Sequence, residues 1–310
     1  MISVIGKTPR ELDQFFTTPN VALKCVNDLK SILTTSLEDI DLILEPSAGN
    51  GAFVNALSGL KNMKFMDIDA VSNSHRSDFL NDDSVEHVFY HQSEKTKIGL
   101  KRKFSDVKRT TCITIGNPPF GKNAGLAIQF FNKAALFSDI IAFILPSSFI
   151  KQSIKTRLDR SFFLVEEHKI PKDSFLLQNK PYDVPCVFQI WIHVESIHMT
   201  TKQLAIPIDK MRPKQTNEVE VSDFKFVNVN ENPDVIIRRN GALAGKIFTK
   251  DLHKWITKNH YFIKVSDRQK VKQVIDKLKS LDLENTPIKF ATAGYPSIGK
   301  AELCALYKKA

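Results

Sequence analysis

The clearest candidate for a chemical site is the turn Asn117-Pro118-Pro119-Phe120, which directly follows the apolar run 111–116. A pair of prolines removes two backbone N–H donors and fixes two φ angles, so it ends a strand. The first proline also holds the residue before it, Asn117, in an extended conformation. The result is a rigid corner at a strand end that presents an amide, which can donate and accept hydrogen bonds, beside an aromatic ring.

A second candidate site begins with the segment 45–53, which reads EPSAGNGAF and follows another apolar run. Its two glycines allow a ligand to approach the backbone closely. A dinucleotide-binding fingerprint needs a third glycine at position 54, where this chain has Val54. The pattern therefore disfavours NAD and leaves open a smaller adenosine ligand without a pyrophosphate.

Acidic residues follow the next part of the chain at positions suited to an adenosine ligand. Asp67 lies 16 residues after Gly51, where its carboxylate would accept hydrogen bonds from ribose hydroxyls. Asp78 would accept from an adenine amino group, and the ring of Phe79 would lie against the base. Each signal alone is weak, because most glycine turns are only turns, so the interpretation depends on their order along the chain.

These turns lie between apolar runs and segments of helical periodicity. Apolar strands that alternate with helices predict an α/β fold, in which a doubly wound parallel sheet is covered by helices on both faces. Ligands bind at the carboxyl ends of the strands in such a sheet. The runs that we interpret as strands lie within 41–54, 63–70, 111–116, 140–146, 162–170 and 185–194, and the main helical segments are 18–33 and 123–137.

The pattern weakens after about residue 200, and we expect a catalytic domain at 1–199 and a smaller basic region at 200–310. Residues 1–199 contain 23 Lys+Arg and 22 Asp+Glu, a net charge of +1, whereas residues 200–310 contain 21 and 12, a net charge of +9. The basic region is either a polyanion-binding region or a lysine-rich solubilising surface. Within it, 267–281 is expected to form an amphipathic helix with Ser266 as its N-cap.

The composition also argues against several classes of protein. No apolar run approaches the roughly 20 residues of a transmembrane helix, and the N-terminus lacks the long apolar core of a signal peptide. We therefore expect no membrane partner and an intracellular protein, cytoplasmic in a bacterium or phage-infected cell and nuclear in a eukaryotic or viral setting. The cysteines are far apart and the histidines show no ligand spacing with them, so we expect reduced thiols and no metal. The cysteines are Cys25, Cys112, Cys186 and Cys304.

The ordered set of motifs resembles that of S-adenosylmethionine-dependent adenine-N6 methyltransferases. The segment 14–22 (QFFTTPNVA), the turn 45–53, Asp67, Asp78-Phe79 and the corner 117–120 follow one another as in the gamma class of DNA adenine methyltransferases. The resemblance covers roughly residues 12–195 and implies a Rossmann-like class I methyltransferase sheet. The last third of the chain resembles no family that we can name.

This resemblance implies a role for each motif residue. The side-chain carbonyl of Asn117 and the backbone carbonyl of Pro118 would accept the adenine amino hydrogens, and Phe120 would stack on the base. The catalytic set is then Asn117, Pro118, Pro119 and Phe120. S-adenosylmethionine would contact Phe16, Thr17, Thr18, Pro19, Glu45, Pro46, Ser47, Ala48, Gly49, Gly51, Phe53, Asp67, Ile68, Asp78, Phe79 and Asn117. The nucleic acid would contact Phe120, Lys122, Phe175, Tyr182, Arg238 and Arg239, with Phe175 preferred over Tyr182 as the second ring against an extruded base.

Two features depart from the family. The separation of 39 residues between Asp78 and Asn117 exceeds what compact members need. It includes the Lys- and Arg-rich segment 94–109, which we interpret as a solvated loop, a phosphate-contacting arm or a nuclear-import signal. The region after residue 200 is small for a sequence-specific recognition domain.

DNA is the favoured substrate, and an RNA adenine-N6 methyltransferase is the alternative. A protein glutamine methyltransferase is less well supported because its N-terminal helical domain is missing. A binding subunit with a degenerate cofactor site is disfavoured by Asp67, Asp78 and Asn117. The sequence does not indicate the recognition site or the oligomeric state.

Overall fold

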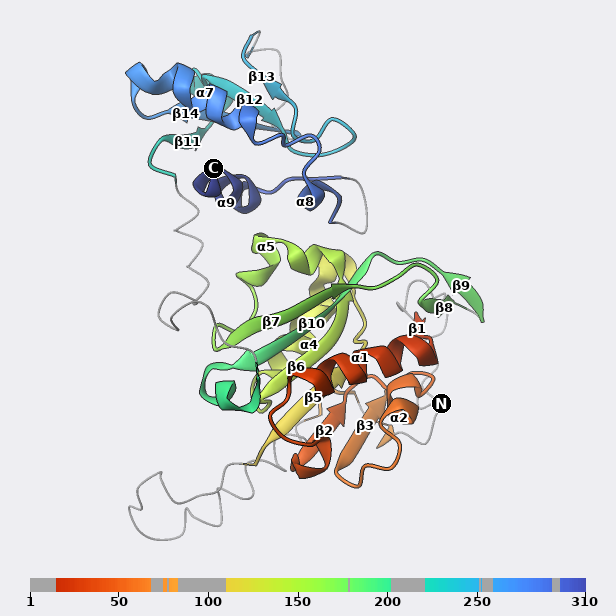
Figure 1. Cartoon of the computed structure of the whole chain (residues 1–310). Coiled ribbons are helices and arrows are strands. Elements are labelled where there is room, and N and C mark those ends of the chain that lie inside the picture. The colour runs from red at the N-terminus through yellow and green to blue at the C-terminus, as the bar shows by residue number, and fades with distance from the viewer. Residues whose placement is uncertain are drawn as a thin grey trace, which may run out of the picture. The chain divides into compact units, whose positions relative to one another are not determined.

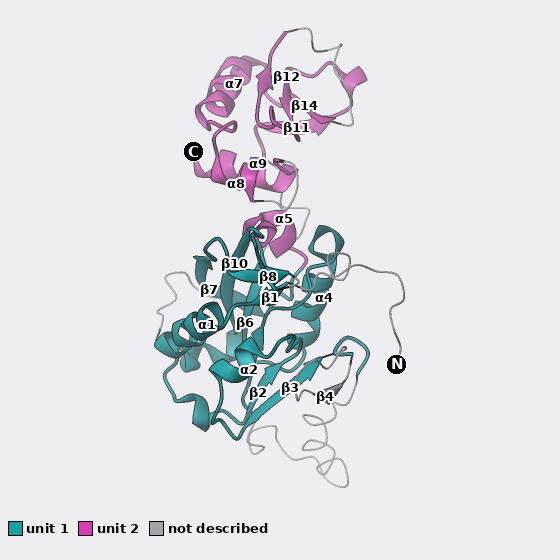
Figure 2. Cartoon of the chain, turned by 90° about the vertical axis from the view of Figure 1, so that its right-hand side faces the viewer, with its two compact units in different colours: residues 1–146, 158–212 teal, residues 147–157, 213–310 magenta. Residues whose placement is uncertain are grey.

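A computed structural model describes residues 15–67, 75–76, 78–82, 110–177, 179–201, 221–250, 252, 259–291 and 296–310. The chain forms two compact units, shown in different colours in Figure 2. Unit 1 comprises Met1–Pro146 and Leu158–Arg212, and unit 2 comprises Ser147–Arg157 and Pro213–Ala310. The sequence placed a single division at residues 199 and 200 and did not predict that the segment 147–157 folds with unit 2.

In the described part of unit 1, the main sheet has seven strands in the order β4-β3-β2-β5-β6-β10-β7. The pairs from β4 to β6 are parallel, and β10 runs antiparallel to both of its neighbours. The strands are β2 (Leu42–Glu45), β3 (Met63–Asp67), β4 (His75–Arg76), β5 (Cys112–Gly116), β6 (Ile140–Pro146), β7 (Phe162–Lys169) and β10 (Cys186–His193).

This arrangement confirms the expected Rossmann-like α/β sheet and corrects it at one strand. A strand that is buried on both faces reads as a continuous apolar run whatever its direction. All residues of β10 except the last are buried. The sequence of β10 could therefore not reveal that it runs antiparallel.

Helices cover both faces of the sheet, and α1 and α4 lie on opposite sides of it in Figures 1 and 2. Helix α1 (Pro19–Ile32) begins with Pro19 at its first position, where a missing N–H costs nothing. Its buried side chains are Ala22, Cys25, Val26, Leu29 and Ile32. Leu23 of the same helix is 49% exposed. The other helices in the described part of unit 1 are η1 (Leu37–Asp39), α2 (Ala52–Ala56), η2 (Lys122–Ala124), α4 (Gly125–Ala134) and η4 (Val194–Met199).

A small antiparallel sheet, β1-β8-β9, joins the N-terminal segment to a later hairpin. Strand β1 (Phe16–Thr17) pairs with β8 (Phe175–Leu177), and β8 pairs with β9 (Lys180–Tyr182). The register sets Phe175 opposite both Thr17 and Tyr182. Two segments about 160 residues apart in sequence are thereby held together beside the main sheet.

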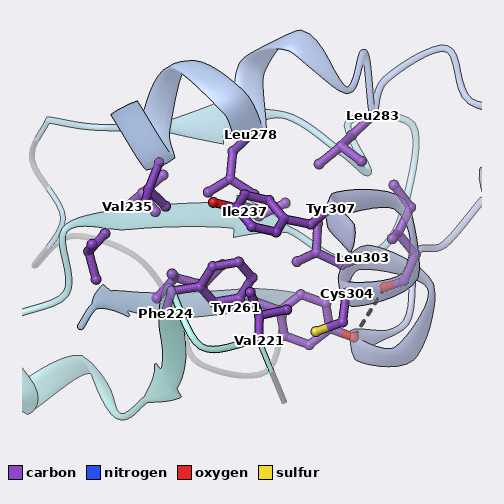
Figure 3. Close-up of a cluster of buried hydrophobic side chains, with 14 residues drawn as sticks. Val221, Phe224, Val235, Ile237, Tyr261, Leu278, Leu283, Leu303, Cys304 and Tyr307 are labelled. Carbon is purple, nitrogen blue, oxygen red and sulfur yellow. Dashed lines mark hydrogen bonds between the residues drawn. The ribbon is translucent and has the colours of Figure 1, made fainter. Parts of the chain in front are cut away.

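Unit 2 contains a four-stranded antiparallel sheet in the order β11-β14-β12-β13. Its core, drawn in Figure 3, packs Phe224 and Ile237 of the sheet with Leu278 of α7 and Leu303 and Tyr307 of α9. The elements among its described residues after 220 are β11 (Phe224–Val227), η6 (Val229–Glu231), β12 (Val235–Arg238), β13 (Ile247–Phe248), β14 (His260–Val265), η9 (Arg268–Lys270), α7 (Val271–Ser280), α8 (Pro287–Phe290) and α9 (Lys300–Lys309).

The helix expected over 267–281 is therefore split into η9 and α7. Asp267, rather than Ser266, caps its start, because the Asp267 carboxylate accepts the backbone N–H of Gln269.

The segment 147–157 contributes η3 (Ser147–Ile150) and α5 (Gln152–Lys155) to unit 2. The Lys151 ammonium donates to the backbone carbonyl and the hydroxyl of Ser297, both at 3.0 Å. The fully buried carboxylate of Glu302 accepts the N–H of Ser153 at 2.9 Å. Burial lowers the pKa of Lys151, and the charge of Glu302 opposes this shift. These contacts hold α5 against α9.

Candidate active site

The predicted cofactor and catalytic motifs meet at one edge of the main sheet. Glu45, Asp67 and Gly116 are the last residues of β2, β3 and β5, which are neighbours in the sheet. The carboxyl ends of adjacent parallel strands form the usual ligand-binding edge of an α/β sheet. The turn after β2 and the corner after β5 therefore lie beside each other.

The turn after β2 is held in a fixed shape. Gly49 and Gly51 have φ angles of +53° and +81°, which L side chains rarely adopt. The N–H of Gly49 donates to Oδ2 of Asp67 at 2.6 Å, which ties the turn to the end of β3. The ring of Phe16 packs on Gly49 so closely that a Cβ at that glycine would lie 3.2 Å from it. Three predicted cofactor residues are thus brought together.

Glu45 is a buried carboxyl group beneath the corner. It is 1% exposed, its Oε1 lies 3.2 Å from the N–H of Ser47 and 3.3 Å from the Ser47 hydroxyl, and its Oε2 has no hydrogen-bond partner among the described residues. Burial raises the pKa of Glu45 to about 8, hydrogen bonds from Ser47 oppose the shift, and the charge of Asp67 adds to it. Glu45 is therefore largely protonated at neutral pH.

The Ser47 hydroxyl links Glu45 to the corner. It lies within reach of two oxygens, Oε1 of Glu45 at 3.3 Å and the backbone carbonyl of Asn117 at 3.1 Å. A serine hydroxyl has only one proton to donate. The hydroxyl therefore shares its proton between Oε1 of Glu45 and the carbonyl of Asn117, and it bridges the buried acid and the corner.

The side-chain amide of Asn117 has a fixed orientation. Its Nδ2 donates to the backbone carbonyl of Phe15 at 3.0 Å and lies 3.1 Å from the hydroxyl of Thr17. A backbone carbonyl can only accept, so the nitrogen must face Phe15 and the oxygen must face away. That oxygen, Oδ1, is buried and has no hydrogen-bond partner among the described residues. The corner thus presents one vacant hydrogen-bond acceptor.

Phe120 closes the corner and begins the next helix. Its carbonyl accepts the N–H groups of Leu126 and Ala127 at 3.1 and 3.2 Å. Gly121 is required here, because its φ is +68° and a Cβ would lie 2.7 Å from the Leu126 side chain. The Phe120 ring is 7% exposed. Pro118 is buried, whereas Pro119 is half-buried and Lys122 is exposed.

Three aromatic rings gather beside this corner. The ring of Phe15 is stacked on Tyr182, with centroids 5.1 Å apart and planes 5° from parallel. It also lies 6.4 Å from the ring of Phe120, at an interplanar angle of 40°. Phe175, the preferred second ring in the sequence analysis, is only 1% exposed, whereas Tyr182 is half-buried.

Phe79, the ring that the sequence assigned to adenine, packs in the core of unit 1. Phe79 is 1% exposed and packs against Phe130 and Phe137, at centroid distances of 5.1 and 6.3 Å. The Asp78 carboxylate accepts from the N–H of Leu80 and from the Asn81 amide, so it stabilises the local turn. Asp78 remains half-buried, but the ring beside it belongs to the core.

The remaining predicted residues fall into four groups. Thr17 is buried, and Thr18 and Pro19 form the start of α1. Ile68 and the segment 94–109 lie outside the described residues. Arg238 and Arg239 belong to unit 2, where Arg238 Nε donates to the carbonyl of Asn240 at 3.0 Å and Arg239 lies over the ring of Tyr261 at 5.4 Å. In unit 1, Pro46, Ala48 and Phe53 lie in or next to the turn after β2.

Sequence reasoning missed Phe15. The motif at 14–22 contains two consecutive phenylalanines, and the sequence assigned only the second of them to the site. Successive side chains of an extended segment point to opposite sides, so a Phe16 that faces Gly49 leaves Phe15 to face the other way.

Among the described residues, no group of three or more potential metal ligands gathers at this edge or elsewhere. No helix in the described ranges has both the length and the apolar character to span a bilayer.

No family model and no curated protein matches the chain. It is similar to a solved structure from Pyrococcus horikoshii described as a candidate RNA methyltransferase, with 21% identity and a TM-score of 0.37 over 61% of this chain and 91% of that one. A candidate SAM-dependent methyltransferase from Streptococcus mutans has 13% identity and a TM-score of 0.31 over 56% of this chain and 48% of that one. Another candidate methyltransferase, solved with SAH, has 13% identity and a TM-score of 0.27 over 49% and 45%. The chain thus spans less than half of the latter two proteins, and at these TM-scores the similarities assign no activity or ligand.

Proposed function

We propose that this chain transfers a methyl group from S-adenosylmethionine to the N6 amino group of adenine in nucleic acid, with DNA as the favoured substrate. The state of the Asn117 amide carries this proposal, because its nitrogen has two partners and its buried oxygen has none. A buried acceptor left unpaired costs about 1–3 kcal/mol. Such a group is expected where a ligand supplies the missing donor, and an amino group is such a donor.

The geometry of the corner suits the chemistry of an exocyclic amine. The amino nitrogen of adenine is a weak nucleophile because its lone pair is delocalised into the ring. Acceptors that face its hydrogens favour a localised lone pair, and Asn117 Oδ1 and the carbonyl of Pro118 are suitable acceptors on adjacent residues. The bound cofactor supplies the methyl group on a positively charged sulfur. The residues of the chain thus contribute positioning and electrostatic stabilisation.

The residues after β2 and β3 fit an adenosine-containing cofactor. Gly49 and Gly51 leave backbone exposed to close approach, and the half-buried Asp67 lies directly beside them. A carboxylate has about four lone-pair sites, so Asp67 can accept from ribose hydroxyls while it holds the N–H of Gly49. The segment from Phe16 to Pro19 borders the same turn through the contact between Phe16 and Gly49.

We assign nucleic-acid binding to the basic region after residue 200, which carries the net charge of +9 and most of unit 2. An adenine stacked in a helix has to be extruded before its amino group can reach Asn117. RNA is the alternative substrate, because it offers the same base and the same chemistry. An experiment that offers DNA and RNA separately therefore distinguishes the two substrates.

The deciding experiment incubates the purified chain with methyl-labelled cofactor and, separately, duplex DNA, single-stranded DNA, total RNA and a glutamine-containing protein. Digestion to nucleosides then identifies the methylated atom. We expect N6-methyladenine in DNA, and N6-methyladenosine in RNA would support the alternative. Asn117→Ala should bind the cofactor normally and lose at least about tenfold in kcat, because it removes an acceptor of the transition state. Methylation of another atom, or a fully active Asn117→Ala variant, would refute the mechanism.

A further inference from the structure

The side chain of Thr17 lies against the amide of the corner. Its Oγ1 is 3.1 Å from Nδ2 of Asn117, and the residue is 4% exposed. The preceding residue, Phe16, packs on Gly49 of the turn after β2. Successive side chains of a strand point to opposite faces, so Thr17 faces the corner while Phe16 faces the turn. The sequence assigned both residues to the cofactor, and their side chains point to different parts of the site.

The hydrogen bonds of the Asn117 amide show what the contact with Thr17 does. The amide nitrogen has two hydrogens to donate. The backbone carbonyl of Phe15 accepts one of them at 3.0 Å, and Thr17 Oγ1 is placed to accept the other. The last torsion of an asparagine side chain is broad and roughly two-fold, so hydrogen bonds decide its setting. Two acceptors on the nitrogen fix the plane of the amide, whereas a single acceptor leaves that plane less well defined.

Thr17 is itself held by strand pairing. It lies opposite Phe175 in the pair of β1 and β8, and the N–H of Thr18 donates to the carbonyl of Ser174 at 3.0 Å. Phe175 and Ser174 are 1% and 2% exposed. The Thr17 hydroxyl therefore projects from buried, hydrogen-bonded backbone, which suits a group that has to hold another side chain to within about 0.5 Å.

We propose that Thr17 is a positioning residue for methyl transfer, whose hydroxyl holds the nitrogen of the Asn117 amide so that Oδ1 faces the amino group of the substrate. This inference rests on the proposed function. Because both hydrogens of the nitrogen are engaged, the corner offers the substrate acceptors, namely Oδ1 and the carbonyl of Pro118. Acceptors pair with an exocyclic amine and repel a keto oxygen, so Thr17 also helps to restrict the site to bases that carry an amine.

The test compares Thr17→Val with Thr17→Ser in the full chain, with the cofactor and the nucleic acid that the parent protein methylates. Valine keeps the branched shape of threonine and removes the hydroxyl, whereas serine keeps the hydroxyl. We expect Thr17→Val to lower kcat at saturating cofactor about 2- to 12-fold, the loss that corresponds to one neutral hydrogen bond. Cofactor affinity by calorimetry should stay unchanged, and Thr17→Ser should keep most of the parent kcat.

The matched control is Thr35→Val, which makes the same change at an exposed hydroxyl that lies 3.3 Å from Oδ2 of Asp39. It should match the parent protein. Thermal unfolding of each variant checks that the fold is kept, and Thr17→Ala is the second variant without a hydroxyl if Thr17→Val does not fold.

Three results would overturn the positioning role while the proposed function stands. One is weaker cofactor binding with an unchanged kcat in Thr17→Val, which would show that Thr17 contacts the cofactor. The others are unchanged kinetics in Thr17→Val and equal losses of kcat in Thr17→Val and Thr17→Ser. A parent protein that methylates no nucleic acid would overturn the proposed function, and the role of Thr17 with it.

Discussion

Gly116 lies directly against the carboxyl group of Glu45. A Cβ built on Gly116 would come within 2.1 Å of Oε1 and 2.6 Å of Oε2. The two residues end the neighbouring strands β5 and β2. The corner that begins at Asn117 is therefore built on a glycine that leaves space for a buried acid, and the acid reaches the corner through Ser47.

The first prediction concerns this contact. Gly116→Ala should destabilise the protein by about 1–3 kcal/mol, because the added methyl group overpacks a site filled by a buried carboxyl group. Chemical denaturation measures the free energy of unfolding. Gly125→Ala is the matched control, because a Cβ at Gly125 in the first turn of α4 meets no atom within 4 Å. It should be neutral or stabilise by up to about 1 kcal/mol. Equal effects of the two substitutions would contradict the packing at Gly116.

The second prediction concerns the pH dependence that Glu45 confers. Burial raises its pKa from 4.5 to about 8, so between these values the unfolded chain loses a proton that the folded chain keeps. The contribution of Glu45 to stability is therefore complete below about pH 4.5 and is lost as the pH rises to about 8. Glu45→Gln has a neutral side chain of the same shape and carries no such dependence.

Thermal unfolding of the parent protein and Glu45→Gln between pH 4.5 and 8.5 tests this. We expect the stability of the parent relative to the variant to decrease steadily across that range. Other titrating groups are common to both proteins and cancel in the difference. A difference that stays constant with pH would show that Glu45 is ionised in the folded protein.

The motif order predicts a candidate site from local features, namely strand ends, glycine turns and the Pro-Pro corner, and the structure brings these segments to one edge of the sheet. The contact between Gly116 and Glu45 was not predictable, since it depends on the register of β2 and β5, in which Leu44 lies opposite Thr114. Register between strands about 70 residues apart is set by packing of the whole sheet.

The environment of the aromatic residues was likewise not predictable from local sequence. The sequence assigned Phe79 to the cofactor because it follows Asp78, and the resemblance assigned Phe175 to the base because the family takes its second ring from the turn before the last long strands. Both side chains are buried at 1% exposure. The local sequence around a phenylalanine in a loop does not show whether its ring faces a ligand or the core, because this depends on the packing of distant segments. Phe79 is covered by Phe130 of α4 and by Phe137, and Phe15 occupies the surface beside the corner.

The third prediction concerns Asp67. Asp67→Ala should weaken S-adenosylmethionine binding about tenfold or more, since hydrogen bonds to a charged acceptor contribute roughly 1.5–3 kcal/mol. It also removes the acceptor of the Gly49 N–H, so part of the loss would come from the turn. Asp67→Asn keeps one oxygen acceptor for Gly49 and should lose less. Calorimetric titration with the cofactor measures both variants, and an unchanged affinity in Asp67→Ala would exclude the ribose role.

The last prediction places nucleic-acid contacts at Arg238 and Arg239. The Arg238 guanidinium is half-buried, donates to the carbonyl of Asn240 and lies 3.4 Å from Nε2 of His260. Arg239 is exposed, and its guanidinium lies over the ring of Tyr261 at 5.4 Å, which limits its orientations. Arg239 is thus the better placed of the two to meet a phosphate, and Arg238 contributes more to the local fold.

We expect Arg239→Ala to flatten the log–log salt dependence of nucleic-acid binding by about 0.7–0.9, because the substitution removes one charge that neutralises a phosphate. KM for nucleic acid should rise, and cofactor affinity should not change. The double variant with Arg238→Ala should flatten the slope further and also lower the unfolding temperature. Arg268→Ala is the matched control within unit 2, because Arg268 is bound to both oxygens of Asp234 at 2.7 Å and its charge is already compensated. A slope for Arg239→Ala equal to that of Arg268→Ala and the parent would show that this cluster does not touch the substrate, and the basic segment 94–109 would become the next candidate.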